Sequence, residues 1–148
     1  MTGWLANLAG MTDWMGTGIA MFPNAAFAAI CAGAALLLIV VNRRWSVRIS
    51  VFFATVVLLV GGASLFQHLS GINLSIDTII VQPRWGNRAS AYPGRIGPPA
   101  SICFTLLGIA LVFSPLRDAR ARRIAPALGI VVCAISALSL MGYLAGAS

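Results

Sequence analysis

Four stretches of the chain consist almost entirely of apolar residues, and the polar residues gather between them. The stretches cover about residues 18–41, 49–67, 99–115 and 124–145. A helix needs about 17 to 25 mostly apolar residues to cross a hydrocarbon core of about 30 Å. The pattern therefore predicts one all-α, integral membrane domain over residues 1–148, with four transmembrane helices and a long loop over residues 68–98.

Two segments outside these spans carry apolar residues at helical spacing. They are Trp4, Leu5, Leu8, Met11, Trp14 and Met15 before the first span, and Ile72, Ile76, Ile79 and Ile80 in the long loop. An apolar stripe on an otherwise polar helix favours a position at the membrane surface. We therefore expect short interfacial amphipathic helices in both places, although the first segment also fits the frayed end of an earlier helix.

Charged residues make up 9% of the chain, against about 25% in ordinary soluble domains. The ten basic residues are all arginines, and seven of them fall in the two shortest connections: Arg43, Arg44, Arg48, Arg117, Arg120, Arg122 and Arg123. The positive-inside rule places such connections in the cytoplasm. The net charge of +7 is thus a topology signal and not a sign of nucleic-acid binding. The N-terminus and residue 148 are expected on the outer side.

A short Leu-small-Gly sequence recurs along the chain, at residues 7–10, 68–71 and 143–146. Pro23 follows the first copy and Pro98 follows the second. A glycine such as Gly71 can end a helix in the left-handed conformation, and a proline tolerates the first position of the next helix because it has no N–H to leave unsatisfied. The recurrence predicts a repeated helix-turn-helix unit whose turns lie on one side of the membrane.

The sequences "LFQHLSGINLSID" (65–77) and "YPGRIGPPASICFTLLGIALVF" (92–113) resemble the membrane-embedded N-terminal sensor regions of bacterial PAS-containing sensor histidine kinases. In that family a Leu-x-Gly helix end is followed by a short amphipathic segment, a Pro-Gly-Arg turn and a proline-led helix. Those positions correspond here to residues 71–77, 93–96 and 98–101. Ile96 stands where the family usually has methionine, and Pro99 and Ser101 depart from the helix-entry motif.

The resemblance implies a sensory or signal-input domain of a two-component system, in the bacterial inner (cytoplasmic) membrane. Such a domain would transmit changes at the outer surface or in the lipid through helix packing, and the longer protein would be a histidine kinase. The alternative is a small integral membrane subunit that scaffolds a respiratory or photosynthetic complex and contacts pigment or quinone. Paired carboxylates, activated nucleophiles and phosphate loops are missing from the sequence, so we expect these 148 residues to be no enzyme and to hold no cofactor.

Three polar residues near the long loop are the main candidates for chemistry. His68, the single histidine, is either a cofactor-binding ligand for haem or chlorophyll or an interfacial polar residue; the second interpretation is preferred because no second histidine exists. Asp77 is expected to pair with Arg84, Arg88 or Arg95, or to form a polar ligand site with them. Arg95, in a Pro-Gly-Arg turn, is expected to point at lipid headgroups or back under the loop, and a specific anionic ligand is the further alternative. Gly71, Asp77, Arg95, Pro98 and Pro23 are the expected structural or signalling positions.

Small residues recur at four-residue spacing on two of the spans: Ala25, Ala29 and Gly33, and Gly129, Cys133 and Ala137. Such ridges let membrane helices approach closely. They predict, besides contact with the lipid bilayer, a homo-oligomer or a larger membrane complex formed through these faces, although ordinary alanine-rich helices would show the same pattern.

Overall fold

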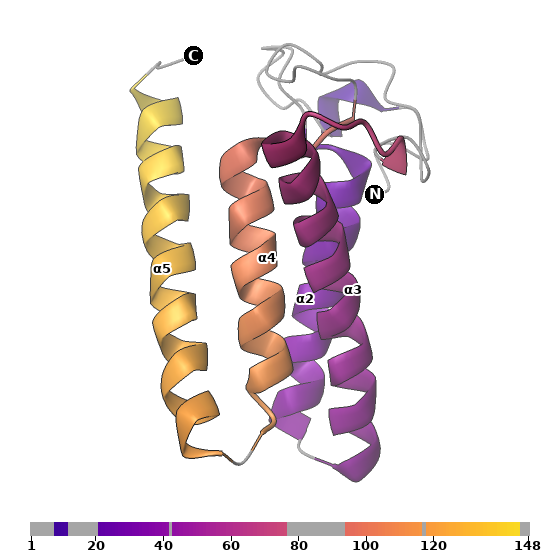
Figure 1. Ribbon diagram of the computed structural model, residues 1–148, viewed down its shortest axis with the longest axis vertical. Coiled ribbons are helices and arrows are strands. Elements are labelled where there is room, and N and C mark those ends of the chain that lie inside the picture. The colour runs from indigo at the N-terminus through magenta and orange to yellow at the C-terminus, as the bar shows by residue number, and fades with distance from the viewer. Residues whose placement is uncertain (1–7, 12–20, 42, 77–93, 117, 146–148) are drawn as a thin grey trace.

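The computed structural model describes residues 8–11, 21–41, 43–76, 94–116 and 118–145. Within these ranges the chain forms a short 3₁₀ helix, η1 (Ala9–Met11), and four α-helices: α2 (Pro23–Val41), α3 (Arg44–Ser70), α4 (Pro98–Phe113) and α5 (Ala119–Leu144). Figure 1 shows the four long helices running side by side along the molecule. The prediction of an all-α fold is confirmed for the described residues, none of which lies in a strand.

Three of the helices are long and apolar enough to cross a membrane, namely α2, α3 and the part of α5 over Ala119–Gly142. The apolar helix α4 has 16 residues, which corresponds to about 24 Å at 1.5 Å per residue. These lengths indicate a multi-pass membrane protein. Two helix starts differ from the expected spans, since α3 begins at Arg44 and not near 49, and α5 begins at Ala119 and not near 124. Arginine is a good helix former, so both helices extend into the basic connections.

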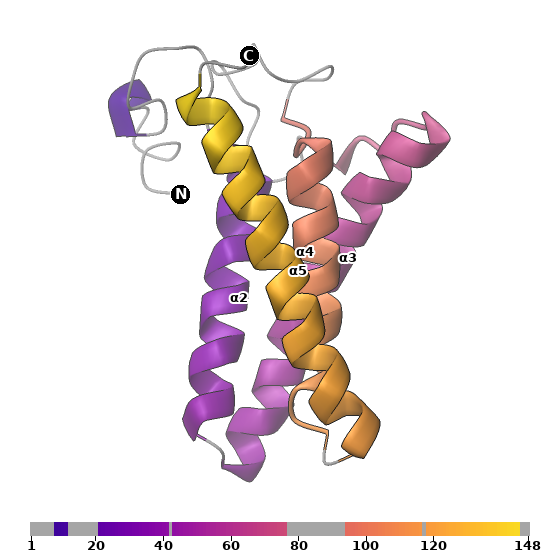
Figure 2. The same cartoon turned by 90° about the vertical axis from the view of Figure 1, so that its left-hand side faces the viewer.

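The two ends of the bundle differ in chemistry and are named accordingly. At the arginine end, at the bottom of Figure 1, α2 and α4 finish and α3 and α5 begin, with Arg43, Arg44, Arg48, Arg120 and Arg123 exposed. At the other end lies the connection between α3 and α4, residues 71–97, which we call the linker. At this linker end, residues 71–76 leave α3 and residues 94–97 enter α4. Figure 2 shows α5 lying against α4, and the helix contacts confirm that α4 is its main neighbour.

Helices α3 and α4 touch through their backbones. A Cβ atom added to Gly61 would lie 2.6 Å from the backbone nitrogen of Thr105, and one added to Gly108 would lie 2.6 Å from the Cα of Leu58. Real Cβ atoms do not approach other atoms that closely, so both sites require glycine. Close backbone approach at small residues is the usual way in which membrane helices associate, because lipid tails are as apolar as the side chains.

Helix α2 packs on this pair with a face of small residues: Ala25, Ala28, Ala32 and Ala35 are buried. The expected face through Ala29 and Gly33 is instead exposed, and an added Cβ at Gly33 would meet nothing within 4 Å. On α5, Gly129 is partly buried, whereas Cys133 and Ala137 are exposed. The two predicted ridges therefore do not hold this chain together, and their role in a larger assembly stays a prediction.

The turn after α3 has the predicted features. Gly71 ends the helix in the left-handed conformation with a φ of 71°, and Pro98 and Pro23 are the first residues of α4 and α2. A repeated helix-turn-helix unit is not shown, however. Gly10 lies within η1 and has no positive φ, so the first copy lacks the conformation of Gly71, and Gly146 of the third copy lies outside the described residues.

The two predicted surface helices are only partly within the described residues. Of the first, Leu8 precedes the single 3₁₀ turn and Met11 ends it, and both are exposed. Residues 1–7 and 12–17 lie outside the described residues. In the second, the expectation of an α-helix is wrong over residues 72–75, which have no helical hydrogen bonding. Side-chain oxygens take up the backbone N–H groups of Ile72, Leu74 and Ser75 there, and such local bonds compete with helix formation.

The glycine contact between α3 and α4 gives a test with a built-in control. We expect Gly61→Ala to lower the free energy of unfolding by about 1–3 kcal/mol, because the new methyl group overlaps the backbone of α4. The adjacent Gly62 has open space at its Cβ position, so Gly62→Ala should be neutral or stabilise the helix by up to about 1 kcal/mol. Unfolding of the micelle-bound protein by a denaturing detergent measures both, and equal effects of the two substitutions would contradict the packing described.

Candidate functional site

Five polar side chains at the linker end bind the backbone of the linker or each other, and we call them the linker cluster: Asn24 from α2, Gln67 and His68 from α3, and Asn73 and Arg95 from the linker. Three of them are almost entirely buried, since Gln67 is 0%, Arg95 3% and Asn24 6% exposed. Buried polar groups are costly unless they form hydrogen bonds. The cluster therefore fixes the conformation of the chain around it.

Gln67 fastens the first part of the linker to the end of α3. Its backbone carbonyl accepts a hydrogen bond from the Gly71 N–H at 3.1 Å, which closes the helix. Its side-chain Oε1 accepts a second bond from the Leu74 N–H at 3.0 Å. The left-handed Gly71 turns the chain back so that this reach is possible.

Asn73 joins the two parts of the linker. Its Oδ1 accepts a hydrogen bond from the Ser75 N–H at 3.0 Å and another from Nη2 of Arg95 at 3.2 Å. The first of these forms an Asx turn, next to Ser75, which has an unusual positive φ of 55°. Because Arg95 precedes α4 closely, this pair connects the chain leaving α3 with the chain entering α4.

Two further bonds extend the connection to other helices. Nε2 of His68 lies 2.7 Å from the carbonyl oxygen of Ile96, and since a carbonyl can only accept, Nε2 carries the proton and donates. Nδ2 of Asn24 donates to the carbonyl of Ile76 at 3.3 Å. The backbone on both sides of the linker is thus hydrogen-bonded to side chains of α2 and α3.

The structure brings several of the predicted residues together. His68, Gly71, Arg95 and Pro98 lie at the same end of the α3–α4 pair, and Pro23 precedes Asn24 at the start of α2. The side chain of Arg95 is buried and donates a hydrogen bond to Asn73, and its expected contact with lipid headgroups stays a prediction. Asp77, Arg84 and Arg88 lie outside the described residues, so the pairing expected for Asp77 stays a prediction.

Sequence analysis missed Asn24, Gln67 and Asn73. A signal for Gln67 existed, because an uncharged amide inside an apolar helix must find hydrogen-bond partners within the protein. Asn24 follows the helix-starting Pro23 and was open to the same argument. Asn73 carried no such signal, since asparagine is common in exposed turns.

The chemistry of the cluster favours holding the backbone over binding a cofactor. For His68 to act as an axial ligand through Nε2, the bond to Ile96 would have to break. Among the described residues no group of three His, Cys, Asp or Glu side chains is placed to hold a metal ion. The interpretation of His68 as a ligand for haem or chlorophyll stays an untested alternative.

Comparison of the chain with protein-family models, with characterised proteins and with solved structures finds no match. The function must therefore be argued from the chain itself.

Replacing Gln67 tests the first connection of the linker cluster. We expect Gln67→Leu, which is similar in size, to cost about 1–3 kcal/mol of unfolding free energy, because it leaves the Leu74 N–H without its acceptor. Limited proteolysis should then cut the linker faster at residues 72–76. Phe66→Leu, at a half-exposed neighbouring position, is the matched control and should change neither quantity. Unchanged proteolysis in Gln67→Leu would show that the side chain does not hold the linker.

Proposed function

We propose that the chain is the membrane-embedded signal-input domain of a histidine kinase-like receptor. The observation that supports it best is the linker cluster, in which five side chains tie the linker to α2 and α3 and join its two parts to each other. A change in the linker, or in the lipid around it, would tilt the locked pair of α3 and α4 relative to α5. The resemblance of residues 65–77 and 92–113 to sensor regions of such receptors agrees with this role.

The bundle offers a mechanical route for such a change. Helices α3 and α4 are locked together at Gly61 and Gly108, so a force at their linker end tilts them as a pair. Helix α5 is attached less firmly, since none of the residues in its apolar 18-residue membrane-spanning stretch is buried. A polar contact joins it to α4, between Sγ of Cys103 and Oγ of Ser136 at 3.8 Å. In a receptor of this kind, α5 and a following helix would carry the shift to cytoplasmic domains.

The distribution of arginines supports an orientation for this domain. Among the described residues, Arg95 is the one arginine at the linker end, and the other six lie at the arginine end. The positive-inside rule then puts the arginine end in the cytoplasm of a bacterial inner membrane and the linker outside. A signal from outside the cell would reach the linker first.

A second candidate function, a small membrane subunit of a larger complex, is favoured by the exposed small-residue faces. Ala29 and Gly33 on α2, and Cys133 and Ala137 on α5, are unused within the chain and suit contact with helices of another protein. The genomic reading frame after Ser148 distinguishes the two proposals. A further span followed by PAS and kinase sequences supports the receptor, and a stop codon supports the subunit.

The contact between Cys103 and Ser136 supplies a reporter for the proposed transmission. In a background with Cys31→Ala, Cys133→Ala and Ser136→Cys, oxidation should join α4 to α5, because the two side chains are already 3.8 Å apart. We expect the further substitution Asn73→Ala to change the cross-linking rate by about fivefold, the lower range of coupling between distant sites.

The control for this experiment is Leu69→Ala, an exposed position at the same end of α3. It should leave the cross-linking rate unchanged. If Asn73→Ala also leaves the rate unchanged while proteolysis shows that the linker has been released, the linker does not govern the packing of α5, and the proposed transmission is wrong.

A further inference from the structure

Helix α5 contains a proline in its interior, Pro126, two turns after its first residue, Ala119. Proline has no N–H, so the carbonyl of Arg122, four residues earlier, lacks its usual helical hydrogen bond, and the proline ring also crowds that carbonyl. Sharp bends in helices are almost always found at such positions. Pro126 is thus the point at which α5 bends most easily.

The burial of α5 changes close to this proline. Before it, Ala121 is 3% exposed, and the short connection of residues 114–118 ties this part of the helix to the end of α4. From Pro126 onward, none of the described side chains of α5 is buried. We call Ala119–Ala125 the foot of α5 and Pro126–Leu144 its shaft. The bundle holds the foot by burial, whereas the shaft lies on its surface.

The contacts of the shaft with α4 are weak. An added Cβ at Gly129, one turn beyond the proline, would meet no atom within 4 Å. The contact of the Ser136 hydroxyl with Sγ of Cys103 is 3.8 Å long, and a thiol is a poor donor and acceptor. Helices α3 and α4, by contrast, touch through their backbones at Gly61 and Gly108. The α3–α4 pair is therefore a rigid frame against which the shaft can move.

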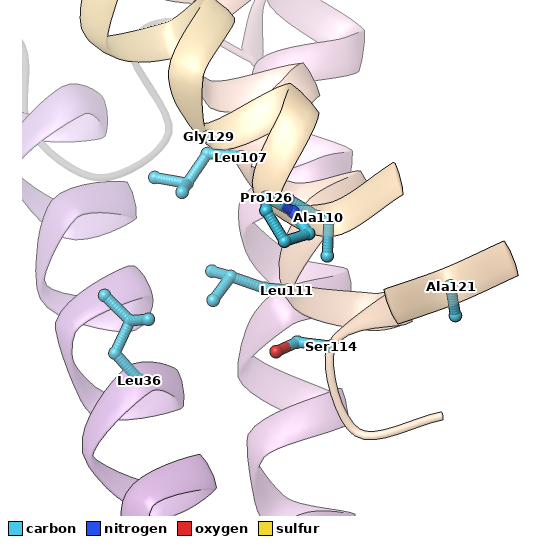
Figure 3. Close-up of a pocket in the computed structure, with 9 residues that line it drawn as sticks. Leu36, Leu107, Ala110, Leu111, Ser114, Ala121, Pro126 and Gly129 are labelled. Carbon is cyan, nitrogen blue, oxygen red and sulfur yellow. The ribbon is translucent and has the colours of Figure 1, made fainter. Parts of the chain in front are cut away.

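The bundle also leaves room beside the proline. A groove lies between α2, α4 and α5, and Pro126 and Gly129 form part of its wall on α5 (Figure 3). Leu36 lines the same groove from α2, and among the described residues α2 and α5 make few direct contacts. A tilt of the shaft relative to α2 thus disturbs fewer packed side chains than a tilt within a close-packed interface would.

We propose that Pro126 is a hinge about which the shaft of α5 pivots while the foot stays fixed to α4. Leu138 lies twelve residues beyond Pro126, about 18 Å along the helix at 1.5 Å per residue. A change of about 20° in the bend would therefore displace Leu138 by roughly 6 Å. The hinge deepens the proposed transmission, and its use in signalling rests on that function, but the bending itself is a property of the helix.

Distances between pairs of nitroxide labels on the full chain in lipid nanodiscs test the hinge. The labels are attached at Leu59→Cys and Leu138→Cys for the shaft, and at Phe52→Cys and Ile124→Cys for the foot, all of which are exposed positions. The background carries Cys31→Ala, Cys103→Ser and Cys133→Ala, in which the new serine keeps a polar group opposite Ser136. We expect the distance distribution of the shaft pair to be broader than that of the foot pair by about 6 Å, the displacement allowed by the hinge.

Substitution of the proline separates the hinge from general looseness of α5. Pro126→Ala restores the missing N–H, so the shaft distribution should become as narrow as that of the foot. Ile130→Ala, at an exposed position one turn further along, keeps the proline and should leave the distribution broad. Alanine is the best helix former, and circular dichroism checks that both variants are helical. If Pro126→Ala fails to fold, Pro126→Leu serves in its place.

Two results would overturn the hinge. They are a shaft distribution as narrow as that of the foot in the chain that retains Pro126, and a broad shaft distribution that Pro126→Ala leaves unchanged. If either is found while Asn73→Ala still alters cross-linking between positions 103 and 136, the hinge is wrong and the transmission stands. A hinge that passes both tests, with cross-linking unaffected by Asn73→Ala, is upheld without the transmission.

Discussion

The structure depends on the direct backbone contact between α3 and α4 at Gly61 and Gly108. Inside a bilayer no hydrophobic force draws helices together, so their association depends on close packing. The two glycines bring the helix axes near enough for α2 to cover the pair with its alanine face. They also set the end of α3 beside the start of α4, which is the geometry that His68 needs to reach the carbonyl of Ile96.

The linker cluster is the polar counterpart of that contact. Burying Gln67 and Arg95 would destabilise the bundle if their polar atoms were unpaired, so the linker is held where those atoms find partners. Among the described residues helix α5 has no comparable fastening, and it leaves a groove beside α2. This difference between a firmly packed pair and a loosely packed helix is the physical basis of the proposed transmission, because movement requires an element that is not locked.

Sequence reasoning located the four helices and the turn at Gly71 and Pro98, because apolar runs, left-handed glycines and helix-starting prolines are local signals. It did not identify which small residues face inward. Ala29 and Gly33 have the same four-residue spacing as the buried Ala28 and Ala32, and only the partner helix decides between the two faces. The partners of Gln67 and Arg95 were hidden for the same reason, since they depend on how the linker folds back.

The most direct measurement of the central claim is hydrogen–deuterium exchange at the amides of Leu74 and Ser75, with the protein in lipid nanodiscs. The Leu74 N–H donates to the side-chain oxygen of the buried Gln67, and the Ser75 N–H donates to that of Asn73, which is exposed. The account predicts that they exchange far more slowly than amides of an unstructured peptide of the same sequence. Exchange at the unstructured rate would show that the linker is not held against the helices, and would contradict the account.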